Sequence, residues 1–383
     1  MTTTWSFPTR IKFGAGCVDE LADEIRGLNG TSAFLVSDRG VVAAGLAKTV
    51  TDALEAEKIT TQVFDAISSN PTEAELIEST EAYKASGANV IIGLGGGSPL
   101  DVAKLIRVLA THEGPIARFD DSIGGADLIT NALPPMIAIP TTAGTGSEVG
   151  RSGVITVEST GIKTVIFAPN LIPNVALLDP ALTVSMPPLT TAATGFDALT
   201  HCIEAYCATG THPMADAIAE SGMRMAAENL VAAVEDGTDL KARGEMMMAA
   251  TMGAVAFQKG LGVCHSLAHP LSAECGLHHG LANAICLPAV LDFNRSAIPG
   301  RIAKIAAIMG VKGEDEETLA FECAGAVRAL RRKVGLPGSL SDAEVAEDLL
   351  PTLADLAFKD ACHTLNPRPC TAEDMLALYR ASM

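Results

Sequence analysis

Aromatic residues are scarce in this 383-residue chain: Phe, Tyr and Trp make up 4% of it, whereas 48% of its residues are hydrophobic. That hydrophobic content is ample for a large buried core. A core built from Ala, Gly and Leu rather than from rings is typical of α/β layers and closely packed helices, and it disfavours a sandwich of short aromatic strands. At roughly 100–200 residues per domain, the length predicts two or three domains.

Positive charge is also in short supply, since the formal net charge is -18. Binding to nucleic acid needs a basic face that neutralises phosphates, so we expect no nucleic-acid partner. No apolar run approaches the roughly 18 residues of a membrane span, so we expect no membrane association. Residues Met1 to Trp5 have neither a basic region nor an apolar core, and we therefore expect no signal peptide.

Paired cysteines are missing as well. The nine cysteines are odd in number and no two have CxxC spacing. Scattered, unpaired thiols in a chain of this size predict a reducing cytoplasm.

The chain changes character near its middle. Before about residue 180, β-branched runs alternate with helical stretches, which predicts a parallel sheet covered by helices on both faces. After about residue 186, Ala/Met/Leu/Glu-rich stretches predict helices only. The prolines between Asp179 and Pro188 mark the joint. We therefore predict an α/β domain over residues 1–182 and an all-helical domain over residues 183–383. The expected strands are 10–13, 31–37, 89–94 and 135–139, and the expected helices are 41–57, 99–111, 213–235 and 240–256.

A glycine-rich loop follows a predicted strand and precedes a predicted helix. Gly95, Gly96, Gly97 and Ser98 give the backbone room to approach a ligand, and free amides at the helix N-terminus favour a phosphate. By itself the run is equally compatible with a tight turn. Asp38, at the end of another strand, can accept hydrogen bonds from both ribose hydroxyls and repels a 2′-phosphate, which favours NAD over NADP; its alternative role is to cap the next turn.

Two further segments favour a nucleotide site. Thr141, Thr142 and Thr145 follow another strand, and Asp101 shares a helix face with Lys104 behind the glycine loop. In the Rossmann fingerprint the glycines come first and the acid follows about 20 residues later. Here the acid comes first and far earlier, so the domain is Rossmann-like with a different topology.

Histidines gather in the second half of the chain. Asp197 and His201 are four residues apart, as are His265 and His269, and each pair shares one face of a predicted helix. A further pair, His278-His279, precedes a glycine. Imidazoles and a carboxylate suit Fe²⁺ or Zn²⁺. An isolated histidine is usually a buried or capping residue, but this grouping favours a metal centre. The spacing leaves open which of the four later histidines is not a ligand.

Several long motifs resemble the iron-containing, or group III, alcohol dehydrogenase family, including its lactaldehyde reductase and 1,3-propanediol dehydrogenase members. The similarity covers essentially the whole chain. The motifs that carry it are GGGSPLDVAK (95–104), PTTAGTGSEV (140–149), ATGFDALTHCIEAY (193–206), GLGVCHSLAHPLSAECGLHHGLANAICLP (260–288) and NPR (366–368).

This resemblance implies a dehydroquinate synthase-like fold, with an N-terminal Rossmann-like domain and an all-α C-terminal domain. It implies NAD and a metal, Fe²⁺ or alternatively Zn²⁺, as cofactors. The family's metal ligands fall on Asp197, His201, His265 and His279, and its non-ligand histidine near the nicotinamide falls on His269. The nucleotide contacts fall on Asn70, the loop from Gly95 to Ser98, the threonines Thr141, Thr142 and Thr145, and Lys163. The family often has Pro where His278 stands, and His279 carries the match to its His-Gly pair.

The expected activity is hydride transfer between the nicotinamide and a small primary alcohol or diol, in either direction, with His269 relaying the proton. A dehydroquinate synthase-like lyase is the first alternative, but residues 260–288 do not gather the Lys and Arg that a phosphorylated substrate needs. A glycerol dehydrogenase-like zinc enzyme is the second, and such enzymes typically lack a full set of one Asp and three His. The resemblance also implies a homodimer, paired through the strand at Arg10 to Phe13.

Overall fold

The structure, a computed structural model, describes residues 5–158 and 160–383. Residues Met1 to Thr4, on which the expected lack of a signal peptide partly depends, lie outside the described residues. The contacts divide the chain into two compact units. The α/β unit comprises Phe7–Thr142 and Gly146–Ser185, and the helical unit comprises Ala143–Thr145 and Met186–Met383 together with Trp5 and Ser6.

The α/β unit contains a six-stranded sheet, in the order β1-β8-β5-β4-β2-β3, in which every pairing is parallel. Its strands are β1 (Arg10–Phe13), β2 (Ser32–Val36), β3 (Thr60–Phe64), β4 (Val90–Gly95), β5 (Met136–Pro140) and β8 (Val175–Leu178). The helices of this unit are α1 (Leu21–Gly27), α2 (Arg39–Ala43), α3 (Leu46–Ala56), α4 (Glu73–Ser86) and α5 (Gly97–Leu109).

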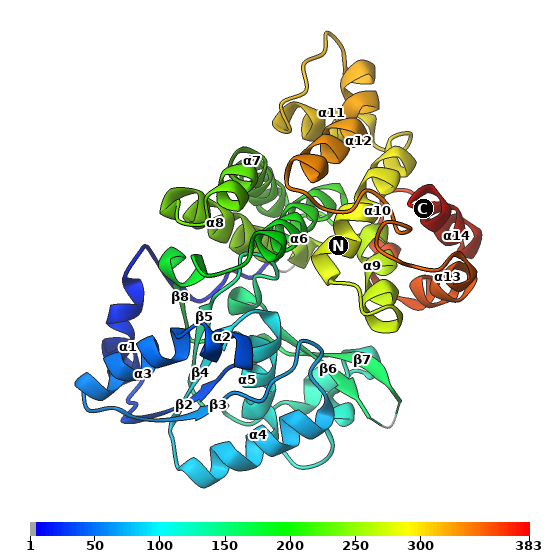
Figure 1. Ribbon diagram of the computed structural model, residues 1–383. Helices are drawn as coiled ribbons and strands as arrows, with labels where there is room; N and C mark the ends of the chain where they lie inside the picture. Colours follow the sequence, from blue (N-terminus) through cyan, green and yellow to red (C-terminus); the bar gives the residue numbers. More distant parts are fainter. Residues whose placement is uncertain (1–4, 159) are drawn as a thin grey trace. The chain divides into compact units, whose positions relative to one another are not determined.

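Helices cover both faces of this sheet, as predicted (Figure 1). Side chains alternate along each strand: Phe34 of β2 belongs to the hydrophobic cluster that includes α4 and α5, whereas its neighbour Leu35 belongs to the cluster that includes α1 and α3. Ile91 and Ile92 of β4 divide between the same two clusters. This double burial explains why these strands are continuous hydrophobic runs in the sequence.

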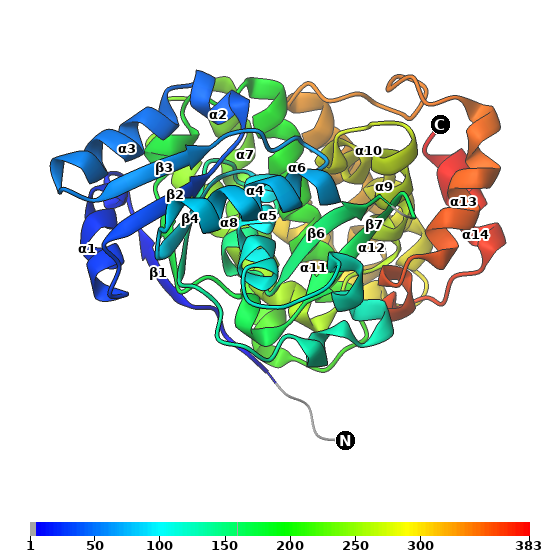
Figure 2. The same ribbon diagram turned by 90° about the horizontal axis from the view of Figure 1, so that it is seen from below.

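Three local features differ from the sequence-based expectation. The helix predicted over 41–57 is broken into α2 and α3, because Gly45 adopts a left-handed conformation (φ 80°) that a continuous helix does not allow. An antiparallel hairpin of β6 (Ser152–Val157) and β7 (Ile162–Phe167) was not predicted; it packs beside α5 (Figure 2). The helix expected from residue 99 begins at Gly97, which places the glycine loop in its first turn.

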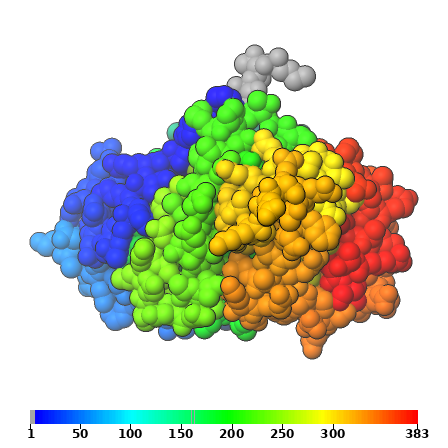
Figure 3. All heavy atoms as spheres, turned by 90° about the horizontal axis from the view of Figure 1, so that it is seen from above, coloured from blue at the N-terminus to red at the C-terminus, as the bar shows by residue number. Residues whose placement is uncertain are grey.

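The helical unit has nine α-helices among its described residues: α6 (Pro188–Cys207), α7 (Pro213–Glu235), α8 (Leu240–Ala256), α9 (Val263–Glu274), α10 (His279–Asn294), α11 (Pro299–Ile308), α12 (Glu316–Lys333), α13 (Leu350–Lys359) and α14 (Ala372–Ala381). Every residue of α6 from Thr191 to Cys207 is buried, and α7, α8 and α10 pack around it. In the space-filling view of Figure 3, α11 and α12 (orange) and α13 and α14 (red) form neighbouring parts of this unit's surface. None of the described helices has the length and apolarity needed to cross a bilayer.

Candidate metal centre and nucleotide site

The central helix α6 carries the first two candidate metal ligands. Asp197 and His201 lie one turn apart on it, and both are at least nine-tenths buried. Close packing holds the helix in place: a Cβ added at Gly253 of α8 would lie 2.9 Å from the Cβ of His201, and one added at Gly195 would lie 2.3 Å from a methyl group of Leu230. These glycines let neighbouring helices approach α6, so the two side chains sit on a rigid element.

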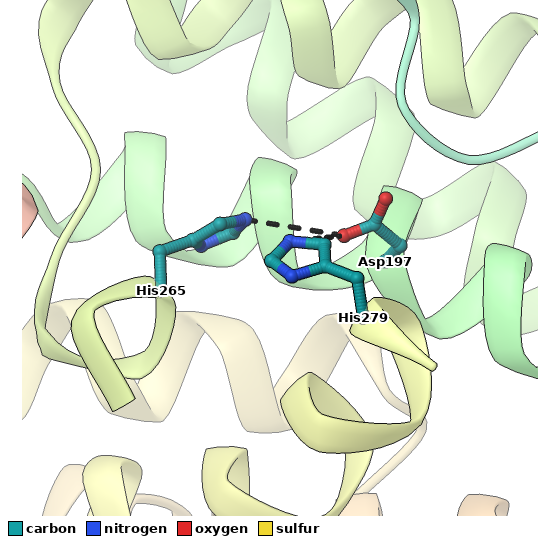
Figure 4. Close-up of side chains that lie close together, drawn as sticks. All are labelled: Asp197, His265 and His279. Carbon is teal, nitrogen blue, oxygen red and sulfur yellow. Dashed lines mark ion pairs between the residues drawn. The ribbon is translucent and has the colours of Figure 1, made fainter. Parts of the chain in front are cut away.

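Three imidazoles converge on one oxygen of Asp197. Its Oδ1 atom lies 3.8 Å from Nε2 of His201, 3.9 Å from Nε2 of His265 and 3.5 Å from Nε2 of His279. Figure 4 shows Asp197, His265 and His279 pointing toward one another from different helices. His201 completes the group by stacking on His265, with ring centroids 4.7 Å apart. The structure therefore brings together all four residues that the sequence predicted as metal ligands.

His265 is held by a carboxylate on the side opposite Asp197. Its Nδ1 atom lies 2.5 Å from Oε2 of Glu204, while its Nε2 atom is buried and has no hydrogen-bond partner among the described residues. Glu204 also accepts hydrogen bonds from the backbone N–H of Cys264 (2.7 Å) and of His265 (3.3 Å), at the N-terminus of α9. A proton on Nδ1 leaves a free lone pair on Nε2. A buried lone pair needs a hydrogen-bond donor or a cation, and no described residue supplies the donor.

Asn283 positions two further candidate ligands, Asp197 and His279. Its amide Nδ2 donates to Oδ1 of Asp197 at 2.9 Å and lies 3.3 Å from Nε2 of His279. His279 begins α10 and Asn283 follows one turn later, so both point from the same helix face. The side chain of Asn283 is fully buried, which makes its orientation a fixed feature of the site.

Of the adjacent histidines, His279 and not His278 faces Asp197. His278 is exposed and precedes α10 as its N-cap residue. The following Gly280 is required by packing, because a Cβ at this position would lie 2.0 Å from the carbonyl oxygen of Ala193 in α6. The His-Gly pair thus has a structural reason: glycine lets α10 approach α6 closely enough for His279 to reach Asp197.

The environment keeps two of the imidazoles neutral. Burial lowers the pKa of His201 to about 4 and lowers the pKa of His279 well below its ordinary value. Burial would also lower the pKa of His265, but the hydrogen bond to Glu204 and its charge outweigh that effect and raise it. Metal binding requires deprotonated ring nitrogens, so the two neutral imidazoles are ready to bind.

His269 lies beside this group without facing Asp197. Its ring stacks on that of His279 with centroids 5.3 Å apart, and its Nδ1 atom lies 2.7 Å from Oδ2 of Asp360. The other oxygen of Asp360 accepts hydrogen bonds from Oγ of Ser266 (2.7 Å) and the N–H of Cys362 (2.8 Å). These contacts lower the pKa of Asp360 in spite of its burial, so it is a fixed anion that orients His269.

In the α/β unit, the nucleotide candidates gather at the carboxyl ends of adjacent strands. Because β2 pairs with β4 so that Val36 lies opposite Gly93, Asp38 lies next to Gly95. A Cβ added at Gly95 would be 3.3 Å from Oδ2 of Asp38, and Gly95 itself has a φ of 149°. Strand pairing thus brings Asp38 beside the glycine loop although it lies far before the loop in the sequence. Oδ1 of Asp38 also caps α2 by accepting from the N–H of Val41 at 2.9 Å, the alternative role considered above.

Four of the remaining candidates line one pocket of about 90 Å³, beside the N-terminus of α5. Asn70, Ser98 and Lys163 line it together with Asp101, and burial lowers the pKa of Lys163. Asp101, however, is engaged within the protein: Oδ1 accepts from Ser147 (2.5 Å), and Oδ2 accepts from the N–H of Val154 (3.1 Å). Asp101 therefore anchors the hairpin to α5 and borders the pocket.

The threonines divide between the two units. The N–H of Thr141 donates to the carbonyl of Gly95 at 2.9 Å, and the side chain of Thr142 lies 3.5 Å from the position of a Cβ at Gly96. Both therefore border the glycine loop. Thr145 is exposed in the short segment Ala143–Thr145, which belongs to the helical unit.

Sequence reasoning missed the residues that position the candidate ligands. Glu204 follows His201 by three residues on α6, and Asn283 follows His279 by four on α10, so helical spacing already contained a signal for both. Asp360 had no such signal, because it is 91 residues from His269 in sequence and only packing brings the two together.

Comparison with known proteins decides the family. The model of iron-containing alcohol dehydrogenases matches residues 8–180, and the model of the C-terminal part of the Fe-containing alcohol dehydrogenase family matches residues 191–383. The chain belongs to the iron-containing alcohol dehydrogenase family. It is therefore an oxidoreductase that acts on alcohols and aldehydes, and the predicted cofactors NAD and iron are those of the family. This membership favours the dehydrogenase over the lyase and glycerol dehydrogenase alternatives.

Relatives and solved structures of this family match nearly the whole chain. The chain is 39% identical to the 4-hydroxybutyrate dehydrogenase of Cupriavidus necator, over 98% of each sequence. A crystal structure of a 1,3-propanediol oxidoreductase superposes with a TM-score of 0.96 at 34% identity, over 100% of both chains. The sulfoacetaldehyde reductase of Bifidobacterium kashiwanohense in complex with NAD⁺ superposes with a TM-score of 0.88 at 28% identity, over 100% of this chain and 99% of that one.

Proposed function

We propose that Asp197, His201, His265 and His279 hold Fe²⁺, and that this alcohol dehydrogenase exchanges a hydride between NAD and a small primary alcohol or diol. The observation that carries the metal assignment is the buried Nε2 atom of His265, which has no hydrogen-bond partner among the described residues and faces Asp197. Ligand atoms placed tetrahedrally at about 2.1 Å from one ion lie about 3.4 Å apart. The 3.5–3.9 Å separations from Asp197 are close to that value and too long for good hydrogen bonds.

When bound, the cation supplies Lewis-acid polarisation of the alcohol or aldehyde oxygen. The surrounding residues prepare its ligands: Glu204 holds the proton of His265 on Nδ1, and Asn283 orients the carboxylate of Asp197. A carboxylate behind a ligating imidazole fixes both its ring orientation and its tautomer. Iron is chosen over zinc because the chain belongs to an iron-containing family.

His269 is the proposed proton relay. Its Nδ1–H donates to Asp360, so Nε2 is the ring nitrogen that exchanges a proton with the substrate, directly or through water. The side chain is 41% exposed, which gives that proton a route to solvent. His265 is assigned as a metal ligand and His269 as the proton relay, because His265 turns its free nitrogen toward Asp197 whereas His269 does not.

We assign the dinucleotide to the α/β unit. The amides of Gly95 to Ser98, at the start of α5, suit the pyrophosphate, and Asp38 suits the ribose hydroxyls. Asn70, Asp101 and Lys163 border the neighbouring pocket, and Thr141 and Thr142 flank the loop. Thr145 completes the set as a nucleotide contact on the strength of the family motif alone.

The test is to strip the purified protein of metal and reconstitute it with Fe²⁺, with Zn²⁺ or with no metal. Each form is assayed for NADH formation from a panel that includes 4-hydroxybutyrate, 1,3-propanediol, 1,2-propanediol and ethanol. Activity that returns only with a metal supports the proposal, identifies the working metal and ranks the substrates. Activity in the metal-free form would contradict the metal assignment. A metal-restored protein that oxidises none of the panel would contradict the substrate class.

The remaining assignments concern organisation. We place the domain boundary between residues 182 and 183, within the 3-10 helix Pro180–Thr183.

We propose a homodimer paired through β1, an edge strand on which Phe13 is half exposed. Sedimentation should then show a dimer for the wild type and a shift toward monomer for Phe13→Asp. A cytoplasmic location is supported by nine free cysteines.

A further inference from the structure

A second group of metal-binding atoms lies beside the candidate iron ligands. One ligand atom from each of His269, Asp360 and Cys362 lies within 4.8 Å of the others. His269 comes from α9, Asp360 directly follows α13, and Cys362 begins the 3-10 helix Cys362–Leu365. All three side chains are half-buried, so the group is packed enough to be ordered and open enough for an ion to enter.

We propose that His269, Asp360 and Cys362 form a second, inhibitory site for a thiophilic divalent cation such as Zn²⁺. An imidazole, a carboxylate and a thiolate are the three ligand types that zinc takes in proteins, and a water molecule completes its tetrahedral shell. Sulfur distinguishes this group from Asp197 and its three histidines, because soft thiolate ligands select Zn²⁺ over harder cations.

Asp360 is already oriented for this role. Ser266 and the N–H of Cys362 hold its Oδ1 atom at 2.7 and 2.8 Å, which leaves Oδ2 facing His269. The same hydrogen bond from Cys362 brings the cysteine backbone next to the carboxylate. A cation that enters takes the place of two protons. The Nδ1 proton of His269 is lost and the ring takes up a proton on Nε2 from solvent, while the thiol proton of Cys362 leaves to solvent.

Burial and the charge of Asp360 raise the pKa of the Cys362 thiol well above its ordinary value. A bound cation supplies the positive charge that stabilises a thiolate at this position. The thiols that neighbour the first group are engaged elsewhere: Cys202 contacts the carbonyl of Ala249 at 3.6 Å, and Cys264 contacts that of Asn283 at 3.6 Å. A metal ion that is coordinated by a thiolate in this region is therefore bound through Cys362, at the second site.

An ion at this site occupies His269 and so removes the proposed proton relay. The inhibition rests on the proposed function of His269, whereas the binding does not, and the two are measured separately. Binding is measured by titrating the Fe²⁺-loaded enzyme with Co²⁺ and recording the thiolate-to-cobalt charge-transfer band in the near ultraviolet. Iron retained by the protein is measured after each addition.

We expect the wild type to develop this band while it retains its iron. Cys362→Ser should lose the band, and Cys370→Ser, a matched change at another half-buried thiol, should keep it. Asp360→Asn should weaken cobalt binding more than tenfold and provides a second variant if Cys362→Ser does not fold. A wild type without the band, or a band that persists in Cys362→Ser, would overturn the site.

Inhibition is measured with Zn²⁺ on the same iron-loaded proteins. Zinc should suppress NADH formation by the wild type and by Cys370→Ser with no loss of iron, whereas Cys362→Ser should keep its basal rate and need at least tenfold more zinc. Equal zinc sensitivity of Cys362→Ser would overturn the inhibitory role. If the wild type showed the cobalt band and Cys362→Ser lost it, while both were equally sensitive to zinc, the metal site would stand and the inhibition through His269 would fall.

Discussion

Nδ1 of His265 and a carboxylate oxygen of Glu204 lie 2.5 Å apart, both fully enclosed in the helical unit. This contact decides which nitrogen of His265 carries the proton and therefore which one faces Asp197. The same carboxylate receives two backbone N–H groups at the start of α9, where the helix dipole favours negative charge. Glu204 thus couples the position of α9 to the donor character of His265.

Replacing Glu204 by Gln should weaken Fe²⁺ binding by about 10–100-fold, the usual cost of losing a partner of a ligating histidine. The amide can place an N–H against Nδ1 and so favour the wrong tautomer. Competition with a chelator measures the affinity, and Glu228→Gln, on the exposed face of α7, is the control. Unchanged affinity in Glu204→Gln would remove the positioning role of this residue.

Gly280→Ala should destabilise the protein by about 1–3 kcal/mol and reduce its metal content, because the added methyl group would lie 2.0 Å from the carbonyl of Ala193 and must push α10 away from α6. Gly325→Ala is the matched control. It lies exposed within α12 with its nearest neighbour at 3.7 Å, so alanine should be neutral or stabilise by about 0.5–1 kcal/mol. Urea unfolding and metal analysis test both; equal stabilities would contradict the packing argument.

Asp38→Ser should raise KM for NAD and increase the ratio of kcat/KM for NADP to that for NAD at least tenfold, because the charge that repels a 2′-phosphate is lost. Serine retains an N-cap hydrogen-bond acceptor for α2, so the local fold should survive. Asp52→Ser removes the same charge from the exposed face of α3 and should leave the ratio unchanged. The proposed ribose contact fails if Asp38→Ser keeps the discrimination of the wild type.

Asp360→Asn should destabilise the metal-free protein by about 1.5–3 kcal/mol at pH 7, since Asp360 accepts three hydrogen bonds as an anion. The pKa of Asp360 is lowered in the folded state, so this contribution is present above the ordinary carboxyl pKa of about 4 and is lost as the pH falls below it. The difference between wild type and variant should therefore shrink on acidification. Urea unfolding at several pH values measures this difference in the free energy of unfolding, with the exposed Asp355→Asn as the control. A difference that does not change with pH would contradict the stabilising role of the ionised Asp360.

Regular elements with strong local signals were predicted well. The helices α7 and α8 and the strand β1 have the bounds expected from the sequence. The failure at residues 41–57 also has a local cause, since periodicity continued through Gly45 while its left-handed backbone ended one helix and began another. The hairpin of β6 and β7 carried only short alternating runs, and its place beside α5 depends on the partly buried hydrogen bonds of Asp101.

The sequence by itself determined the family, the two-part plan and the candidates for the metal and nucleotide sites, because those signals lie in short motifs and in helical spacing. Only the tertiary structure decided that His279 rather than His278 faces Asp197, that Asp38 adjoins Gly95, and that Asp360 orients His269. These relationships join residues from different elements, and strand register and helix packing set such distances. A side chain's neighbours across a packed interface are not encoded in its local pattern.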